Sequence, residues 1–279
     1  MKKRMKALVK IFKATLCLAI AGCVMAACSD DENIFQPRLP QNGGSPVMSI
    51  EHLGTVPSCF DWTFYYSGQY MTQAVGMRRD PEPANDKSYS YTSSLSYGEM
   101  SVGIKNSSKE NVSVRLNALG YIQTMEVGND TYNFNYDLNG YMMSWEKISR
   151  ENSFGQVQQF ITRATITFRD GNLEKVEYTE PDDKPVVITF TSATLPNMNG
   201  LLPATSSKEL GCLGFEHLYY AGLLGRSTAN LVKSVHYDFA DGTHNDYTTE
   251  YEYSVRNGNT VLCNYHTKDG NVASVKYGY

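Results

Sequence analysis

From about residue 59 onward, apolar and polar residues alternate along the chain with a period of two. In "ATITF" (164–168), alanine, isoleucine and phenylalanine fall on one side and two threonines on the other. The segments "VHYDF" (235–239) and "YEYSV" (251–255) repeat the pattern. Because successive side chains of a strand point to opposite faces, this alternation predicts strands with one buried and one solvated face. The many tyrosine, threonine and valine residues favour the same structure.

Glycine-containing turns separate the alternating segments. "RDGN" (169–172), "RNGN" (256–259) and "KDGN" (268–271) look like three versions of one hairpin turn, in which Asp or Asn precedes a glycine that adopts positive φ. "NALGY" (117–121) and "DLNGY" (137–141) add two more, with glycines twenty residues apart, the length of one strand–turn–strand unit. We therefore predict an all-β fold for residues 59–279, an antiparallel meander of stacked hairpins that forms a curved sheet or open barrel.

One segment departs from this pattern. "SSKELGCLGFEHLYYAGLLG" (206–225) has leucines at helical spacings, with Ser206 or Ser207 as candidate N-cap. It predicts one short helix near residues 207–224, packed on the sheet or plugging it.

The beginning of the chain has a different composition. Residues 1–13 carry six Lys or Arg and no acid, and residues 14–27 are uncharged and mostly apolar. A basic segment followed by a short apolar one is typical of a secretory signal. The apolar run has fourteen residues, whereas a membrane-spanning helix needs about 20. We therefore expect residues 1–27 to be a signal peptide.

The end of this segment resembles a bacterial lipoprotein signal, in which a cysteine becomes the lipidated N-terminus. Cys28 is the expected lipidation site, and Cys23 is the alternative. The residues after Cys28 resemble the acidic export tag of surface lipoproteins of Bacteroidota: Ser29, Asp30, Asp31 and Glu32. Residues 28–58 then read as a flexible tether. The expectation is a lipid-anchored protein of the outer membrane, exposed at the cell surface, with a periplasm-facing position as the alternative.

Charge narrows the range of partners. Without residues 1–27, 19 Lys and Arg oppose 29 Asp and Glu, a net charge of about −10. A chain this acidic is unsuited to nucleic acid, which requires a basic surface. Polar residues on both strand faces argue against a lipid-facing barrel, and we expect a monomer. The remaining cysteines, Cys59, Cys212 and Cys263, show no pairing signal, so buried free thiols are favoured over a disulfide.

Candidate chemistry is sparse. The histidines and acids in "HYDFADGTHND" (236–246) are interpreted as a polar strand face followed by a turn, and "EPDDKP" (180–185) as a turn with solvated acids. The aromatic clusters "FDWTFYY" (60–66) and "YMMSW" (141–145) are either core or a platform for a sugar or lipid, and core is favoured. No recognised catalytic, metal or phosphate motif is present. We expect no enzymatic activity, no catalytic residues, no metal and no cofactor.

Several segments together resemble one family: "YNFNYDLNGYMMSW" (132–145), "ATITFRDGNLEKVEY" (164–178), "LYYAGLLGRSTANLVKSV" (218–235) and "GNVASVKYGY" (270–279). The chain is similar in these features to the domain-of-unknown-function family 4595, secreted lipoproteins of Bacteroidota. The hairpins also loosely resemble YD repeats. The family resemblance implies a curved, porin-like antiparallel sheet and no known activity.

Three classes of function remain, in this order. The first is a binding or carrier module for a lipid or glycan. The second is a structural or interaction protein, such as an adhesin or a subunit of a surface complex. The third is a hydrolase.

Overall fold

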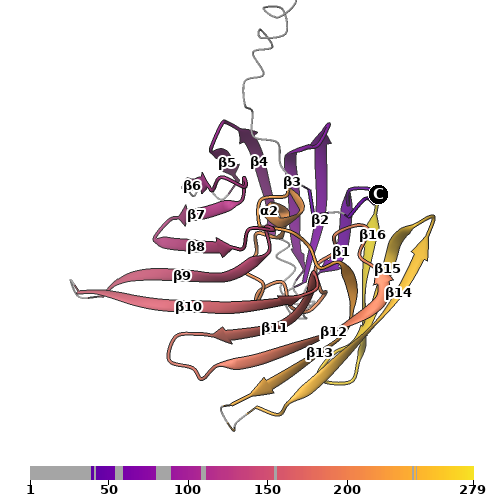
Figure 1. The fold of residues 1–279 in the computed structure, drawn as a ribbon. Helices are drawn as coiled ribbons and strands as arrows, with labels where there is room; N and C mark the ends of the chain where they lie inside the picture. The colour runs from indigo at the N-terminus through magenta and orange to yellow at the C-terminus, as the bar shows by residue number, and fades with distance from the viewer. Residues whose placement is uncertain are drawn as a thin grey trace, which may run out of the picture. The chain divides into compact units, whose positions relative to one another are not determined.

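The alternating segments form antiparallel strands that close into a barrel (Figure 1). The computed structural model describes residues 39–40, 42–53, 59–79, 89–107, 111–153, 156–240, 242 and 244–279. In this part of the chain the elements are β1 (Ser49–Leu53), β2 (Cys59–Ser67), β3 (Tyr70–Arg79), β4 (Tyr89–Tyr97), β5 (Val102–Asn106), β6 (Asn111–Leu116), β7 (Ile122–Val127), β8 (Asp130–Tyr136), β9 (Met142–Ser153), β10 (Gln156–Arg169), β11 (Asn172–Thr179), β12 (Val186–Pro196), α2 (Glu216–Tyr220), β13 (Asn230–Phe239), β14 (Tyr247–Arg256), β15 (Asn259–His266) and β16 (Val272–Gly278).

The strands follow one another around the barrel in chain order, so the predicted meander is confirmed. The sheet is closed rather than open, because β1 pairs with β16, with Ile50 opposite Tyr277. An exposed Lys276–Glu51 pair, 3.4 Å between Nζ and Oε2, lies on this seam. The boundary expected at Cys59 is therefore revised: the closing strand β1 comes from the segment interpreted as tether. β1 has only five residues, which are too few for an alternating pattern to distinguish a strand from a linker.

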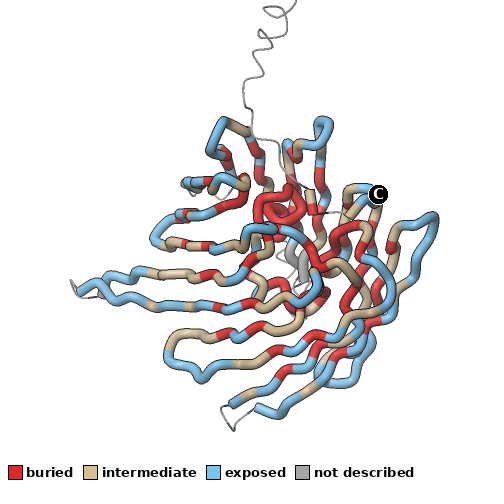
Figure 2. The backbone as a smooth tube through the Cα atoms, in the orientation of Figure 1, coloured by how far each residue is buried: buried red, intermediate tan, exposed pale blue. Residues whose placement is uncertain are grey.

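The period-two pattern separates the inside of the barrel from the outside (Figure 2). In β10, Ala164 and Ile166 are buried while Thr165 is exposed, and in β13, Val235 and Tyr237 are buried while His236 between them is exposed. Apolar side chains thus face the interior and polar ones face out.

The hairpin turns divide into two kinds. In the β10–β11 and β14–β15 turns, two consecutive residues have positive φ, Asp170–Gly171 and Asn257–Gly258, as a two-residue type I′ turn requires. "KDGN" does not belong with them. In its turn the amide of Gly270 donates to the carbonyl of Thr267, the same arrangement as in "NALGY" and "DLNGY". The three turns predicted to be alike therefore belong to two different classes.

The chain between β12 and β13, residues 197–229, packs inside the barrel, and we call it the plug. Most of its residues are buried, and α2 lies within the ring of strands (Figure 1). Backbone hydrogen bonds join it to the wall: Ile122 N donates to Leu223 O (2.8 Å), and Arg226 N donates to Gly140 O (2.9 Å). The predicted plugging element is thus present. No helix among the described residues is long and apolar enough to cross a membrane.

The helix itself is shorter than residues 207–224. Only Glu216–Tyr220 is α-helical, because Gly211, Leu213, Gly214 and Gly222 have positive φ, which a right-handed helix does not accommodate. Neither serine is its N-cap. That position is held by Phe215, which makes no side-chain capping bond, and Ser207 instead donates to the buried carboxylate of Glu216.

Candidate functional site

The residues predicted to carry the lipid and the export tag, Cys28 (or Cys23) and 29–32, lie outside the described residues. Cys212 and Cys263 are buried free thiols, as the sequence favoured. Burial raises the pKa of both, so they are poor nucleophiles.

The tryptophans of the two aromatic clusters singled out in the sequence belong to the core, whereas Tyr65 and Met143 of the same clusters are exposed. Trp62 is 1% exposed and Trp145 is 2% exposed. The ring of Trp62 packs on that of the buried His217 in the plug, with 5.1 Å between centroids. Trp145 Nε1 donates to the plug carbonyl of Glu209 (2.9 Å). These rings hold the plug in the barrel and are not a platform for a ligand.

The histidine and acid cluster is divided by the fold. His236 is exposed on β13 and bonds Thr248 through Nδ1 (2.9 Å). Asp246 accepts from the amide of Phe239 (3.0 Å) and closes the β13–β14 loop, and the ring of His244 packs on Phe239. Among the described residues, no three His, Cys, Asp or Glu side chains come together as metal ligands would.

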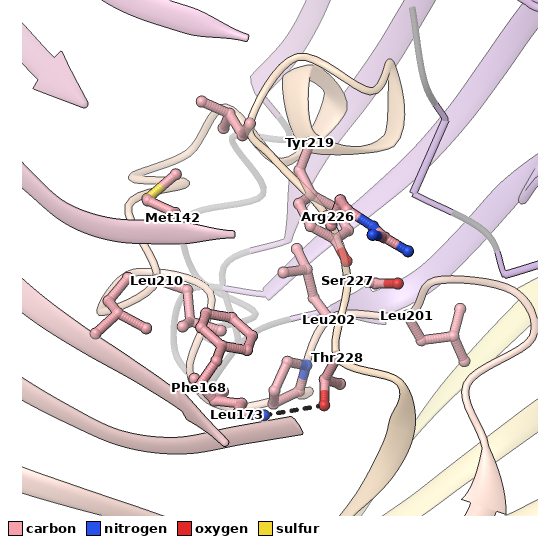
Figure 3. A pocket seen from close by; sticks show the side chains of 13 residues that line it. Met142, Phe168, Leu173, Leu201, Leu202, Leu210, Tyr219, Arg226, Ser227 and Thr228 are labelled. Carbon is pink, nitrogen blue, oxygen red and sulfur yellow. Dashed lines mark hydrogen bonds between the residues drawn. The ribbon is translucent and has the colours of Figure 1, made fainter. Parts of the chain in front are cut away.

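An apolar cavity lies between the plug and the wall (Figure 3). Met142, Phe168 and Leu173 reach it from the wall, and Leu202 and Tyr219 from the plug. Its volume of about 40 Å³ has room for only a few water-sized groups. This cavity is a packing gap and not a binding site for a chain-like ligand.

A larger cavity opens where the plug meets β11–β14, and we call it the rim cavity. Its volume is about 250 Å³. Wall, turn and plug contribute its lining: Tyr178, Glu180, Asp183, Lys184, Val186, Ile188, Lys208, Glu209, Tyr237, Phe239, His244 and Tyr247.

The charged side of the rim cavity joins wall to plug. Glu180 is held at the end of β11 by the turn that follows, in which Asp183 N donates to Glu180 O (3.2 Å). Its Oε1 accepts from Tyr178 Oη (2.6 Å) and from Lys208 Nζ of the plug. These bonds, Lys208 first, lower the pKa of Glu180. The ammonium of Lys208 also lies 5.2 Å from the centroid of the Tyr178 ring, within range of a cation–π interaction. Glu180 is therefore anchored rather than freely solvated, contrary to the expectation for "EPDDKP".

Glu209, the next residue of the plug, has a different environment. Part of the residue is exposed, but its Oε2 is buried and has no hydrogen-bond partner within the described part of the chain. Burial raises the pKa of this carboxyl to about 7, and the charge of Glu180 adds to the effect while Lys208 opposes it. Near neutral pH the carboxyl can thus either donate or accept a hydrogen bond.

Stacked aromatic rings form a second part of the lining of the rim cavity. Tyr237 and Tyr247 are paired across β13 and β14, and their rings stack with centroids 4.6 Å apart and planes 14° from parallel. Phe239 extends the stack, 6.1 Å from Tyr247. Tyr237 is the buried end of the stack, and its hydroxyl bonds Ser206 of the plug (2.9 Å). Burial, then the charge of Glu209, raises the pKa of Tyr247 to about 12, so its hydroxyl stays protonated.

The rim cavity therefore combines flat apolar rings with hydrogen-bond donors and acceptors. Two lysines, Lys184 and Lys208, balance two acids, Glu180 and Asp183, and Glu209 is partly protonated. Such a lining suits a neutral ligand that has apolar faces and many hydroxyl groups.

The site did not emerge from the sequence because its parts lie far apart along the chain. The available signals were the alternating aromatic residues of "VHYDF" and the acids of "EPDDKP", each interpreted separately. No local sequence feature indicates that Lys208 and Glu209, which lie in a segment predicted as helix, line the same cavity as these aromatic and acidic residues.

The family model described as "Domain of unknown function (DUF4595) with porin-like fold" matches residues 69–262. A crystal structure of a porin-like protein from Bacteroides uniformis is similar, with a TM-score of 0.64 and 18% identity, over 84% of this chain and 98% of that chain. A porin-like protein from Bacteroides vulgatus is similar with a TM-score of 0.50 and 14% identity, over the same shares. At these identities the likeness shows the fold alone. No curated protein matches the chain.

Proposed function

Since the chain belongs to the family of unknown function with porin-like fold, whose fold leaves its role open, we propose that it is a surface-anchored binding protein. Its rim cavity takes a neutral, polyhydroxylated ligand of the kind that a glycan offers, and it does so without catalysis. A lipid on Cys28 tethers it to the outer membrane. The observation that carries the binding proposal is that the stack of Tyr237, Tyr247 and Phe239 lines one cavity together with Lys208, Glu180 and Glu209.

The chemistry of sugars fits this lining. A pyranose ring presents a face of C–H groups, which packs on aromatic rings, and an edge of hydroxyl groups, each of which both donates and accepts. Lys208 supplies donors, Glu180 an acceptor and Glu209 either. Because the charges in the lining balance, a strongly anionic or cationic ligand would gain little. The volume of about 250 Å³ lies just below the range of about 300–1,000 Å³ for drug-sized ligands, which favours one or two sugar units.

The filled interior of the barrel favours a ligand that binds at the end of the barrel over a solute that passes through it. The plug fills the space that a pore needs, and the remaining apolar cavity of about 40 Å³ is too small for an acyl chain. The outer surface carries exposed charges, including Glu177, Lys233 and Glu250, where a lipid-facing barrel requires an apolar band. A glycan is therefore favoured over a lipid, and a barrel standing in water over one embedded in the membrane.

Interaction through strand addition is less favoured. Strand addition needs an unpaired sheet edge, and each described strand has two neighbours because β1 pairs with β16.

A glycoside hydrolase is the second candidate, because two carboxyls in different protonation states face one cavity, as acid and base in such enzymes do. Binding is preferred because Glu180 Oε1 is already engaged by Lys208 and Tyr178. Prolonged incubation of the protein with a bound glycan, followed by mass spectrometry of the sugar, separates the two. Shortened products that disappear in Glu209→Gln would establish the hydrolase.

The binding proposal is tested by a neutral-glycan array followed by calorimetry on the best glycan. Tyr247→Ala removes the central ring of the stack and is expected to weaken binding on the order of tenfold, from an aromatic contact of about 1 kcal/mol or slightly more. Tyr65→Ala, on the outer face of β2 where the side chain is 48% exposed, is the matched control and should bind like the wild type. Equal affinity in all three proteins would refute the site.

A further inference from the structure

A second hollow adjoins the rim cavity, and we call it the outer hollow. Its volume is about 420 Å³, and it shares Phe239, His244 and Tyr247 with the rim cavity. Its other lining includes Asn245, Lys268 and Asp269. Because three side chains line both spaces, the two hollows lie side by side, with the aromatic stack as their common wall.

The outer hollow is built from the rim of the barrel. Asn245 belongs to the β13–β14 loop, which the bond from Phe239 N to Asp246 Oδ1 closes. Lys268 and Asp269 belong to the β15–β16 turn, in which Thr267 N donates to Asn271 O (2.8 Å). The side chains of Asn245, Lys268 and Asp269 are exposed, so this hollow is open to solvent.

The opposite end of the rim cavity is closed by the plug. Tyr237 Oη bonds Ser206, and behind it Thr205 Oγ1 lies 2.6 Å from the hydroxyl of Tyr251 on the wall. Glu209, three residues further along the plug than Ser206, lines the cavity too, and its buried Oε2 has no partner among the described residues. A ligand can therefore extend outward over the aromatic stack but not inward through the barrel.

We propose that the rim cavity and the outer hollow are successive subsites of one groove, and that this groove takes a linear neutral oligosaccharide by its chain end. The inference rests on the proposed function of the rim cavity. The terminal unit lies in the rim cavity, with a hydroxyl bonded to Glu209. The next unit crosses Tyr247 and Phe239 into the outer hollow, where Lys268, Asp269 and Asn245 supply hydrogen bonds. An internal sugar unit of the oligosaccharide cannot occupy the rim cavity, because the plug leaves no room for a further unit on the inner side of that cavity.

The test uses neutral oligosaccharides, each as a length series from the monosaccharide upward, coupled to the array by one end in one set and by the other end in a second set. Binding is expected in one orientation only. Affinity should rise about tenfold from the monosaccharide to the di- or trisaccharide and then level off. Equal binding in both orientations, or a monosaccharide bound as tightly as the longer members, would overturn chain-end recognition and leave the binding site standing. Failure to bind any neutral glycan would overturn the proposed function with it.

Variants separate the two subsites. Lys268→Ala and Asp269→Ala are expected to abolish the gain with chain length and to leave monosaccharide binding unchanged. Glu209→Gln, in the rim cavity, should weaken all lengths by the same factor. Lys233→Ala, an exposed substitution on the outer face of β13, is the control for loss of a lysine. Loss of monosaccharide binding in Lys268→Ala would contradict the two-subsite groove.

Discussion

Substitution of Glu209 by glutamine tests whether the lining of the rim cavity holds a buried carboxyl. Burial is the main cause that raises its pKa from the ordinary 4.5 to about 7. The folded protein then keeps the proton up to about pH 7, whereas the unfolded chain releases it above about pH 4.5. Folding stability contributed by this group is therefore complete below pH 4.5, falls as pH rises through this window, and stays low above pH 7.

The size of the effect follows from the two pKa values. A change from 4.5 to about 7 corresponds to about 3 kcal/mol, at about 1.36 kcal/mol per pKa unit. Glutamine has nearly the same shape and does not titrate. The free energy of unfolding of Glu209→Gln, relative to the wild type, should therefore increase by about 3 kcal/mol between pH 4 and pH 8.

The assay is urea unfolding followed by the fluorescence of the two buried tryptophans, Trp62 and Trp145, at both pH values. Other groups also change protonation on unfolding in this range: His217, whose pKa burial lowers to about 3, is neutral in the folded protein but becomes protonated on unfolding at pH 4. Their effects cancel in the difference between variant and wild type. Glu252→Gln, on the exposed outer face of β14, controls for the substitution itself. A Glu209→Gln difference that is the same at pH 4 and pH 8 would refute the burial of this carboxyl.

Two further predictions concern the plug and the anchor. Gly211 (φ +81°) and Gly258 (φ +80°) share a backbone conformation, so alanine at either position costs about 1–2 kcal/mol of backbone strain. An added Cβ would lie 2.9 Å from a ring atom of Trp145 at Gly211 but would contact nothing at Gly258, so Gly211→Ala is expected to cost about 1–3 kcal/mol more from overpacking. Equal thermal stabilities of Gly211→Ala and Gly258→Ala would contradict a plug packed on the wall. Cys28→Ala is expected to abolish incorporation of labelled fatty acid, while Cys23→Ala leaves the mature protein lipidated, and the reverse result would move the anchor to Cys23.

The sequence predicts much of the wall because strands and hairpin turns are local features. Alternation in "ATITF" and the Asp-Gly and Asn-Gly pairs suffice for β10, β11 and the turn between them. Closure is not local. It depends on β1 meeting β16 across nearly the whole chain, and β1 is a short strand in a segment rich in Pro, Gly and Asn.

The ends of the helix and the rim cavity were not predicted from the sequence for the same reason, which is the path of the plug. Leucine spacing predicts a helix across 207–224, but glycines at positive φ let the plug turn repeatedly inside the barrel. That path brings Lys208 to Glu180 and Glu209 to the ring stack. No pattern in the sequence specifies which residues of the plug reach the end of the barrel, so the cavity becomes visible only in three dimensions.

Native mass spectrometry of the protein, purified without a tag from its own host, tests whether the rim cavity binds a neutral glycan. We predict that a neutral, sugar-sized mass accompanies the wild-type protein and the Tyr65→Ala control and is lost from Tyr247→Ala. A protein that carries no added mass, or one that carries a lipid retained in Tyr247→Ala, would contradict glycan binding in the rim cavity.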